Sequence, residues 1–404
     1  MYSLRSLYQI GYGPSSSHTM GPAKAASRIK ALFDGLDHYE VTLYNSLALT
    51  GTGHLTQEAI KESLAPSAVT FFTSIDPLKH PNTIIIKGFL NKELKLEKEV
   101  MSVGGGRIVF KDEEDHEPII YPHTTFKAIK TYCRTHHLTL ADYVFQFEGE
   151  GIYDFLKEVW EAMKHAIQRG ISTEGILPGP LKMKRKAPKL FNQDPTKEVA
   201  EITENRLVSS YAFAVSEENA SGGIIVTAPT CGACGVLPAV LFYMHEKHDV
   251  VTEERIIRGL AVAGLIGNLI KHNASISGAV AGCQAEIGSA CSMAAAAHAT
   301  LFNLSMDQVE YAAEIAMEHH LGLTCDPING YVQIPCIERN AVAALRAIDA
   351  CGLAYFLTDS RKISLDMVIK TMYQTGLDMH TSYKETSQGG LAIHYEEDEN
   401  VNCW

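Results

Sequence analysis

Three cysteines in the second half of the sequence have neighbours that suit metal ligation better than core packing. Cys283 stands between a glycine and a glutamine, Cys325 precedes an Asp-Pro pair, and Cys336 follows a proline. These neighbours predict irregular backbone around Cys325 and Cys336, and cysteines held on rigid loops suit a thiolate-ligated metal centre. The spacing along the chain matches neither a zinc ribbon nor a compact electron-transfer ferredoxin.

The sequence gives weaker evidence that the remaining cysteines are metal ligands or redox residues. Six of the nine lie between residues 231 and 336, a clustering that favours a metal or redox site over scattered packing. Cys231 and Cys234 form a C-x-x-C in "TAPTCGACG", which is either a ligand or redox pair or a glycine-rich turn lined by small residues. Cys133, Cys291 and Cys351 sit in helical patterns and are interpreted as ordinary thiols.

A run of polar side chains near the start of the chain suggests a small-molecule site. In "GYGPSSSHTMGP", Ser15, Ser16, Ser17, His18 and Thr19 stand directly before an expected helix start. A helix N-terminus with flanking hydroxyls is a good receptor for a carboxylate or phosphate. The alternative is a plain turn with a helix cap.

Two further glycine-rich loops occur in the same region. "LALTGTGHLT" (47–56) carries His54, and "SVGGGRI" (102–108) begins at Ser102. Each loop alone is compatible with a tight turn. Three such loops close together predict that they converge on one ligand.

Composition excludes several classes of function. The 404 residues are 46% hydrophobic and 20% charged, with a formal net charge of −12, which argues against a nucleic-acid or anionic-membrane surface. The N-terminal stretch lacks the apolar core of a signal peptide, and the later apolar stretches are too short or broken to span a bilayer. We therefore expect a cytoplasmic protein with neither a membrane nor a nucleic-acid partner.

The periodicity of the chain predicts an α+β fold with two domains. Residues 23–36 have helical spacing, whereas 39–49, 82–89 and 106–110 are rich in β-branched and aliphatic residues and read as strands. From about residue 124 nearly all patterns are helical. We expect an α+β domain with a small sheet over 1–122 and a larger all-α catalytic domain over 123–404.

Long motifs in the sequence resemble those of the iron–sulfur-dependent L-serine dehydratases of the single-chain bacterial form. The motifs are "GPSSSHTMGP", "GTGH", "SVGGG", "TEGILPGPLKMKRKA", "ISGAVAGCQAEIGSACSMAAAA" and "CDPINGYVQIPCIERN", and the resemblance covers nearly the whole chain. It implies a 4Fe-4S cluster and conversion of L-serine to pyruvate and ammonia without pyridoxal phosphate. We also expect a homodimer. Position by position, the resemblance implies Cys283, Cys325 and Cys336 as cluster ligands.

The resemblance also implies roles for the polar loops. Ser15, Ser16, Ser17, His18 and Thr19, with Ser102, would bind the substrate or line its pocket. Two motifs depart from the family pattern: Asn and Ala are common where this chain has Cys231 and Cys234, and a second glycine is usual after "GTGH".

Serine dehydration needs a Lewis acid for the leaving hydroxide and a base for the Cα proton. The cluster would supply the first, and histidine is the natural candidate for the second. We expect His54 as the general base, with His80 as second choice. The alternatives are the same chemistry on L-threonine or L-cysteine, a non-catalytic iron–sulfur sensor or electron carrier, and a pyridoxal-phosphate enzyme.

The penultimate residue, Cys403, stands in a polar segment without helical or strand pattern. We hypothesise that the C-terminus folds back, that the Cys403 thiolate takes the fourth cluster position until serine displaces it, and that Trp404 seats the tail. The alternative is a disordered end with an irrelevant thiol.

Overall fold

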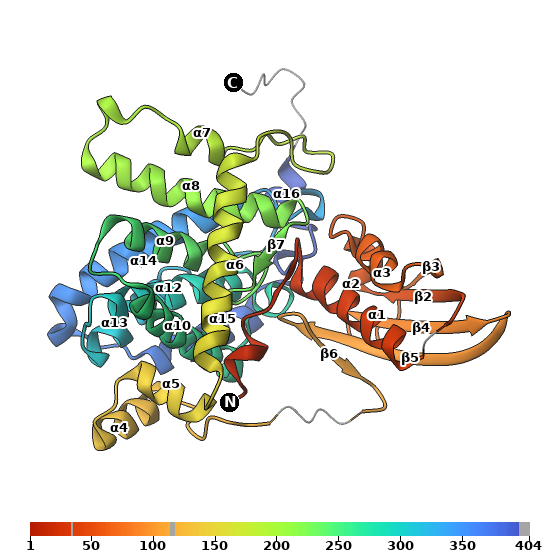
Figure 1. Cartoon of the computed structure of the whole chain (residues 1–404), viewed down its shortest axis with the longest axis horizontal. Coiled ribbons are helices and arrows are strands. Elements are labelled where there is room, and N and C mark those ends of the chain that lie inside the picture. Colours follow the sequence, from red (N-terminus) through yellow and green to blue (C-terminus); the bar gives the residue numbers. More distant parts are fainter. Residues whose placement is uncertain (34, 114–117, 396–404) are drawn as a thin grey trace.

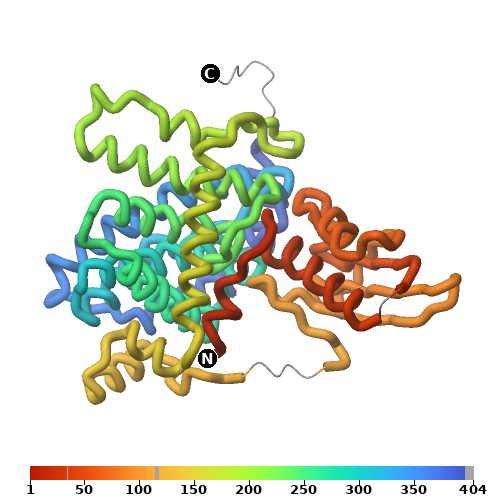
Figure 2. Tube along the Cα trace, in the orientation of Figure 1, coloured from red at the N-terminus to blue at the C-terminus, as the bar shows by residue number. Residues whose placement is uncertain are grey.

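The chain folds into a sheet-bearing body and a larger helical body that meet side by side (Figure 1). The structure is a computed structural model, and it describes residues 1–33, 35–113 and 118–395. The sheet body precedes most of the helical body in sequence, as the run of colours along the chain shows in Figure 2. The fold is therefore α+β, as predicted.

A mixed five-stranded sheet in the order β3-β2-β4-β5-β6 forms the first body. β2 and β3 are parallel, with His38 opposite Ala68, and the other neighbours are antiparallel. Alternate residues of β2 are buried, because one face of the sheet packs on helices α1 and α3. The bounds are β2 (His38–Tyr44), β3 (Ala68–Ser74), β4 (Thr83–Leu90), β5 (Glu93–Gly104), β6 (Arg107–Phe110), α1 (Gly21–Leu32), α2 (Ser46–Thr50) and α3 (Thr56–Leu64).

The second body is built from helices around one extended core. Its centre is α12, in which every residue but Thr300 is buried, since alanines on all its sides let neighbouring helices approach closely. The bounds are α4 (Phe126–His136), α5 (Leu140–Glu148), α6 (Ile152–Ser172), α7 (Ala187–Phe191), α8 (Ala200–Ala220), α9 (Val236–Lys247), α10 (Glu253–Asn273), α11 (Gly278–Ala281), α12 (Ser289–Leu301), α13 (Met306–Glu318), α14 (Cys336–Leu357), α15 (Leu365–Asp378) and α16 (Leu391–His394).

The N-terminal segment connects the two bodies. Leu4, Leu7 and Tyr8 are buried in the helical core, and Tyr8 donates a hydrogen bond to the carbonyl of Leu260. Strand β1 (Ile10–Tyr12) then pairs antiparallel with β7 (Ile224–Val226). The domain boundary near residue 122 stays a proposal, with this segment crossing it.

Three local expectations differ from the structure. The strand expected over 39–49 ends at Tyr44, because Asn45 has a left-handed φ of 48° and α2 follows. The polar run Ser16–Met20 is a π-helical turn that continues directly into α1. Cys336 was expected in irregular backbone but is the first residue of α14, so its thiol stands at a helix N-terminus.

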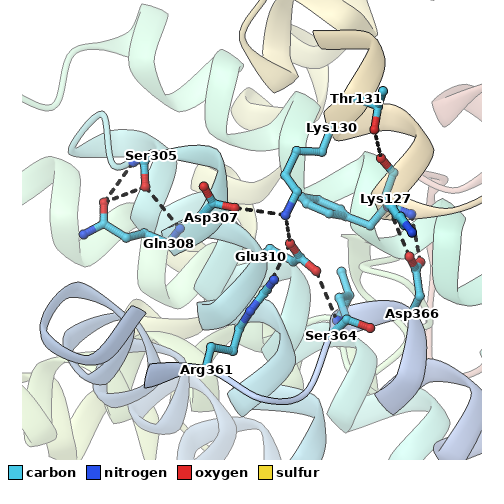
Figure 3. Close-up of polar contacts among 12 residues, drawn as sticks. Lys127, Lys130, Thr131, Ser305, Asp307, Gln308, Glu310, Arg361, Ser364 and Asp366 are labelled. Atoms are coloured by element: carbon cyan, nitrogen blue, oxygen red, sulfur yellow. Dashed lines mark hydrogen bonds and ion pairs between the residues drawn. The ribbon is translucent and has the colours of Figure 1, made fainter. Parts of the chain in front are cut away.

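A buried ion network joins helices α4, α13 and α15 to one another (Figure 3). Glu310 of α13 pairs with Lys130 of α4 and with Arg361, which precedes α15. The Glu310 side chain is 3% exposed, whereas Asp307, the outer partner of Lys130, is 40% exposed. Asp366 also accepts hydrogen bonds from the first backbone N–H groups of α4.

One helical stretch, Cys336–Ser360, is long and apolar enough to cross a membrane by length and composition alone. Its inner side packs on α8, α12 and α13, and its outer side is exposed.

Candidate active site

A cavity lies where the sheet body meets the helical body, and all three polar loops reach it. The three loops therefore line one cavity, and the ligand on which they would converge stays a prediction. The cavity is lined by Pro14, Ser15, Ser16, Ser17, His54, Gly104, Gly105, Thr230, Gly232, Ile276, Ser277, Gly278, Cys283, Glu286, Cys325, Pro327, Val332, Cys336 and Glu385.

Three buried cysteines from separate parts of the chain share this cavity. Cys283 lies between α11 and the turn before α12, Cys325 lies in the loop after α13, and Cys336 begins α14. The sulfur atoms of Cys283 and Cys325 and a carboxylate oxygen of Glu286 all lie within 4.8 Å of one another. The fold therefore assembles the three cysteines that the sequence singled out.

Backbone hydrogen bonds hold Cys325 and Cys336 in place. The backbone N–H of Cys325 donates a hydrogen bond to the carbonyl of Tyr383, and the carbonyl of Cys325 accepts one from the backbone N–H of Glu385, each at 2.8 Å. The C-terminal segment therefore fixes the backbone of Cys325 on both sides. The Asn340 side chain donates to the carbonyl of Cys336 at 2.9 Å and to that of Gly232 at 2.8 Å. This bridge ties the start of α14 to the C-G-A-C turn.

The buried thiols stay protonated unless a cation binds beside them. The hydrogen bond with Cys283 and then burial raise the pKa of Cys325 well above its ordinary value, and burial does the same to the pKa of Cys336. Buried sulfur atoms crowded together without a cation would stay protonated, whereas a thiophilic metal centre would stabilise them as thiolates. Arg339, beside Cys283 and Cys336, adds positive charge. The donor set fits an iron–sulfur cluster.

Two partly buried glutamates, Glu286 and Glu385, line the cavity as well, and both were missed by sequence reasoning. Glu286 accepts a hydrogen bond from the Thr230 hydroxyl at 2.8 Å, and its other oxygen lies 3.9 Å from the Cys325 sulfur. Burial raises the pKa of Glu286 and raises that of Glu385 to about 8. The sequence offered one sign that Glu286 belongs to the site, because it stands three residues after Cys283.

The serine run stands beside the cavity at the start of a continuous helical run. Ser15, Ser16 and Ser17 line the cavity, and Ser15 caps the turn by accepting a hydrogen bond from the backbone of His18. His18 lies behind them, with its ring nitrogens 2.8 Å from the Ser17 hydroxyl and 3.0 Å from that of Ser46. His18 therefore orients Ser17 and is not among the described residues that line the cavity.

His54 lines the cavity, and its ring nitrogen Nε2 is buried with no hydrogen-bond partner among the described residues. Its Nδ1 lies 3.0 Å from the Thr50 carbonyl and must carry the proton, so Nε2, the unpartnered atom, carries the lone pair. Burial lowers the pKa of His54 to about 4, against a smaller upward effect of the Thr50 hydrogen bond. The ring is thus neutral near pH 7 and able to accept a proton.

The other predicted site residues lie outside the cavity lining. The Thr19 hydroxyl donates to the His54 carbonyl at 2.6 Å and so positions its loop. Ser102 is buried against Gly21, where a Cβ would approach its hydroxyl oxygen to 2.2 Å. His80 lies before β4, where Nδ1 accepts a hydrogen bond from Asn82 at 3.1 Å.

The C-G-A-C turn contributes its backbone to the cavity rather than its sulfur atoms. Gly232 lines the cavity, whereas the Cys231 sulfur lies 3.8 Å from that of Met20 and Cys234 faces the carbonyl of Val215. Burial raises the pKa of both thiols. Cys403 and Trp404 lie outside the described residues.

Comparison with known proteins gives two family matches and several relatives. Residues 57–392 match the family described as the serine dehydratase alpha chain, and residues 3–72 match the serine dehydratase beta chain. L-serine dehydratase 1 of Escherichia coli is 40% identical, over 97% of this chain and 99% of the relative. L-serine dehydratase of Haemophilus influenzae shows the same values, and L-serine dehydratase TdcG of Escherichia coli is 41% identical over the same shares.

Proposed function

The chain belongs to the serine dehydratase family, and we propose that it converts L-serine to pyruvate and ammonia with an iron–sulfur cluster and a histidine base. The observation that carries the proposal is the shared cavity, where three buried cysteines, the serine run and the open Nε2 of His54 meet. A homodimeric, cytoplasmic enzyme is part of the same proposal.

Cys283, Cys325 and Cys336 would hold the cluster, a 4Fe-4S centre in the family that the motifs resemble. With three thiolate ligands, such a group supplies Lewis acidity that eases departure of the substrate's hydroxyl group. The fixed backbone around Cys325 and Cys336 keeps the thiols in place.

The zwitterionic substrate needs partners of both signs, and the cavity lining offers them. The hydroxyls of Ser15, Ser16 and Ser17 stand at the N-terminal end of the helical run that includes α1, where a carboxylate is stabilised by the helix dipole. Glu286 and Glu385 are the carboxyl groups in the lining, and we assign the substrate's ammonium group to Glu286, which Thr230 holds in place. These opposite anchors would orient Cα within the cavity.

His54 would remove the Cα proton through Nε2. The Thr50 carbonyl fixes the tautomer, and the His18 ring, whose centroid lies 4.6 Å away, packs against the base. Loss of the Cα proton and the Cβ hydroxyl gives water and 2-aminoacrylate, which tautomerises and hydrolyses to pyruvate and ammonium. A carboxylate bound beside the ring would raise the pKa of His54 toward neutrality and strengthen it as a base.

Cys403 stays the proposed fourth ligand in the absence of substrate. The described part of the C-terminal segment supports this, because residues Tyr383 and Glu385 bracket Cys325 and the Leu391 backbone donates to Asp326 at 2.8 Å. The chain thus passes beside the cysteine cavity shortly before the tail.

The experiment that tests the function is an anaerobic assay of the reconstituted protein. Iron and sulfide are quantified, and 2-oxo-acid formation is then measured separately from L-serine, L-threonine and L-cysteine. The proposal predicts pyruvate from L-serine with the highest kcat/KM. A higher kcat/KM for L-threonine or L-cysteine would make that amino acid the substrate instead of L-serine. No turnover in a fully loaded sample would favour the sensor or electron-carrier alternative.

A further inference from the structure

Arg339 is a charged residue beside the cysteine cavity to which the proposed reaction assigns no step. It stands on α14 three residues after Cys336, so the two side chains lie on one face of the helix, about a turn apart. The Arg339 side chain is 16% exposed. Its guanidinium group hydrogen-bonds the sulfur of Cys283, and its charge interacts with the sulfur of Cys336. A largely buried cation therefore acts on two of the three proposed cluster ligands.

The same guanidinium group fixes the loop that carries the third cysteine. Its Nη1 donates a hydrogen bond to the carbonyl of Thr324 at 2.7 Å, and its Nη2 donates one to Oδ1 of Asp326 at 3.0 Å. Thr324 and Asp326 are the residues directly before and after Cys325. Arginine suits this task because its planar fork of donors can bind several acceptors at once, whereas lysine offers a single ammonium group. Arg339 thus connects the elements that carry all three cysteines.

Asp326 is buried and is held on its other side as well. Its side chain is 4% exposed, and its Oδ2 accepts a hydrogen bond from the Leu391 backbone at 2.8 Å. The Thr324 hydroxyl donates to its Oδ1 at 3.2 Å. Charges that are shielded from water are screened only weakly, so both members of the Arg339–Asp326 pair act on a group bound in the cavity. Because their signs are opposite, they have opposite effects on charge at the cysteine sulfur atoms.

We propose that Arg339 is a positioning residue that holds the cysteines together around the cluster and, through its hydrogen bond to Cys283, sets how tightly the cluster is bound and at what potential it is reduced. The inference rests on the proposed function, since it needs the cluster. A hydrogen bond to a ligand sulfur and a nearby cation both stabilise the reduced, more negative state of an iron–sulfur centre. Loss of the Arg339 charge therefore lowers the reduction potential, whereas loss of the Asp326 charge raises it.

Two variants of the buried pair separate this role from a purely structural one. Arg339→Gln and Asp326→Asn break the same ion pair and loosen the same loop, but they remove charges of opposite sign. The reduction potential of the full-length, anaerobically reconstituted protein is measured by a redox titration followed by electron paramagnetic resonance. Arg339→Gln should lower the potential by about 59 mV or more, which is a tenfold change in the one-electron equilibrium, and Asp326→Asn should raise it.

Retention of the cluster is the second measurement. The rate at which a chelator removes iron under anaerobic conditions should rise about 10- to 100-fold in Arg339→Gln. Arg339→Lys keeps the charge but not the planar fork, so it should nearly keep the potential and still lose iron faster than the wild type. Arg346→Gln is the matched control, because it removes an arginine about two turns further along α14 whose side chain is 45% exposed. It should leave both measurements unchanged.

The outcomes distinguish this inference from the function on which it rests. A wild type that binds no iron and sulfide overturns both. A loaded wild type whose potential and rate of iron loss are matched by Arg339→Gln overturns the inference alone, as does a potential that shifts in the same direction in Arg339→Gln and Asp326→Asn. Circular dichroism verifies folding. If Arg339→Gln does not fold, an unchanged rate of iron loss in Arg339→Lys or a lowered potential in Asp326→Asn overturns the inference.

Discussion

His54 has one engaged and one open ring nitrogen, and this asymmetry defines its proposed role. Replacing His54 with alanine should lower kcat by about 10²–10⁴-fold, because the Cα proton loses its acceptor. Iron and sulfide content should not change, since the thiol ligands come from other elements. Steady-state kinetics and metal analysis of the same preparation check this.

His80→Ala is the matched comparison, because His80 lies in the loop before β4 and hydrogen-bonds Asn82. It should lower kcat by much less. If His54→Ala stays within a few-fold of the wild type while His80→Ala is inactive with its cluster intact, the base is His80.

Glu286 provides a test of how the substrate is recognised. Glu286→Gln keeps the shape of the side chain but removes the charge that faces the ammonium group, so KM for L-serine should rise about 10-fold or more. The inhibition constant of 3-hydroxypropionate, which lacks the amino group, should stay nearly unchanged, as should iron content. Glu338→Gln, at an exposed position on α14, is the control. Equal weakening of both compounds would contradict the assignment.

At the scale of elements, the ion network of Figure 3 predicts unequal costs for two neighbouring carboxylates on α13. Glu310→Ala leaves Lys130 and Arg361 with a buried partner missing and should lower the free energy of unfolding by about 3 kcal/mol or more. Asp307→Ala removes a partly exposed partner and should cost less than about 1 kcal/mol. Denaturant unfolding of the two variants checks the order, and equal costs would contradict it.

Helices and strands with strong periodicity were predictable from sequence, and their junctions were not. α1 and α6 follow from helical spacing, and β4 from its run of isoleucines. The break after Tyr44 was missed because Asn45 is held by long-range contacts: its side chain donates to the carbonyl of Asp76 at 2.8 Å. No local pattern reports such a contact.

For the whole molecule, buried neutral histidines predict loss of stability in mild acid. Burial lowers the pKa of His298, in α12, to about 4, with Glu204 raising it and His248 lowering it by smaller amounts. The unfolded chain binds a proton near pH 6.5 and the folded chain near pH 4, so stability is full above pH 6.5 and falls as pH drops toward 4. His298 alone accounts for about 3 kcal/mol of this loss.

A variant isolates that contribution. His298→Phe should show a shallower decline in unfolding free energy between pH 6.5 and 4 than the wild type, as measured by denaturant titrations at each pH. Since the comparison is between slopes, a uniform packing cost in the variant does not affect it. Parallel pH curves would contradict the assignment of His298 as a buried neutral group.

Most candidate site residues were predictable because they stand in distinctive loops, and the carboxylates were not. Cys283, Cys325 and Cys336 are marked by glycine and proline neighbours, and His54 by its glycine loop. Glu385 reaches the cavity only because the C-terminal segment pairs with Cys325, sixty residues earlier in the chain. Such a return of the chain depends on tertiary packing, which leaves no local pattern in the sequence.

The central claim is that three cysteines hold an iron–sulfur cluster that serine dehydration requires. The most direct measurement is iron per chain, paired with pyruvate formation, in anaerobically reconstituted alanine variants of each of those cysteines. Cys283→Ala, Cys325→Ala and Cys336→Ala should each lose iron and turnover together, whereas Cys291→Ala and Cys351→Ala, at core positions, should keep both. Full iron and turnover in any of the first three, or loss of iron in Cys231→Ala and Cys234→Ala but not in Cys283→Ala, would contradict the account.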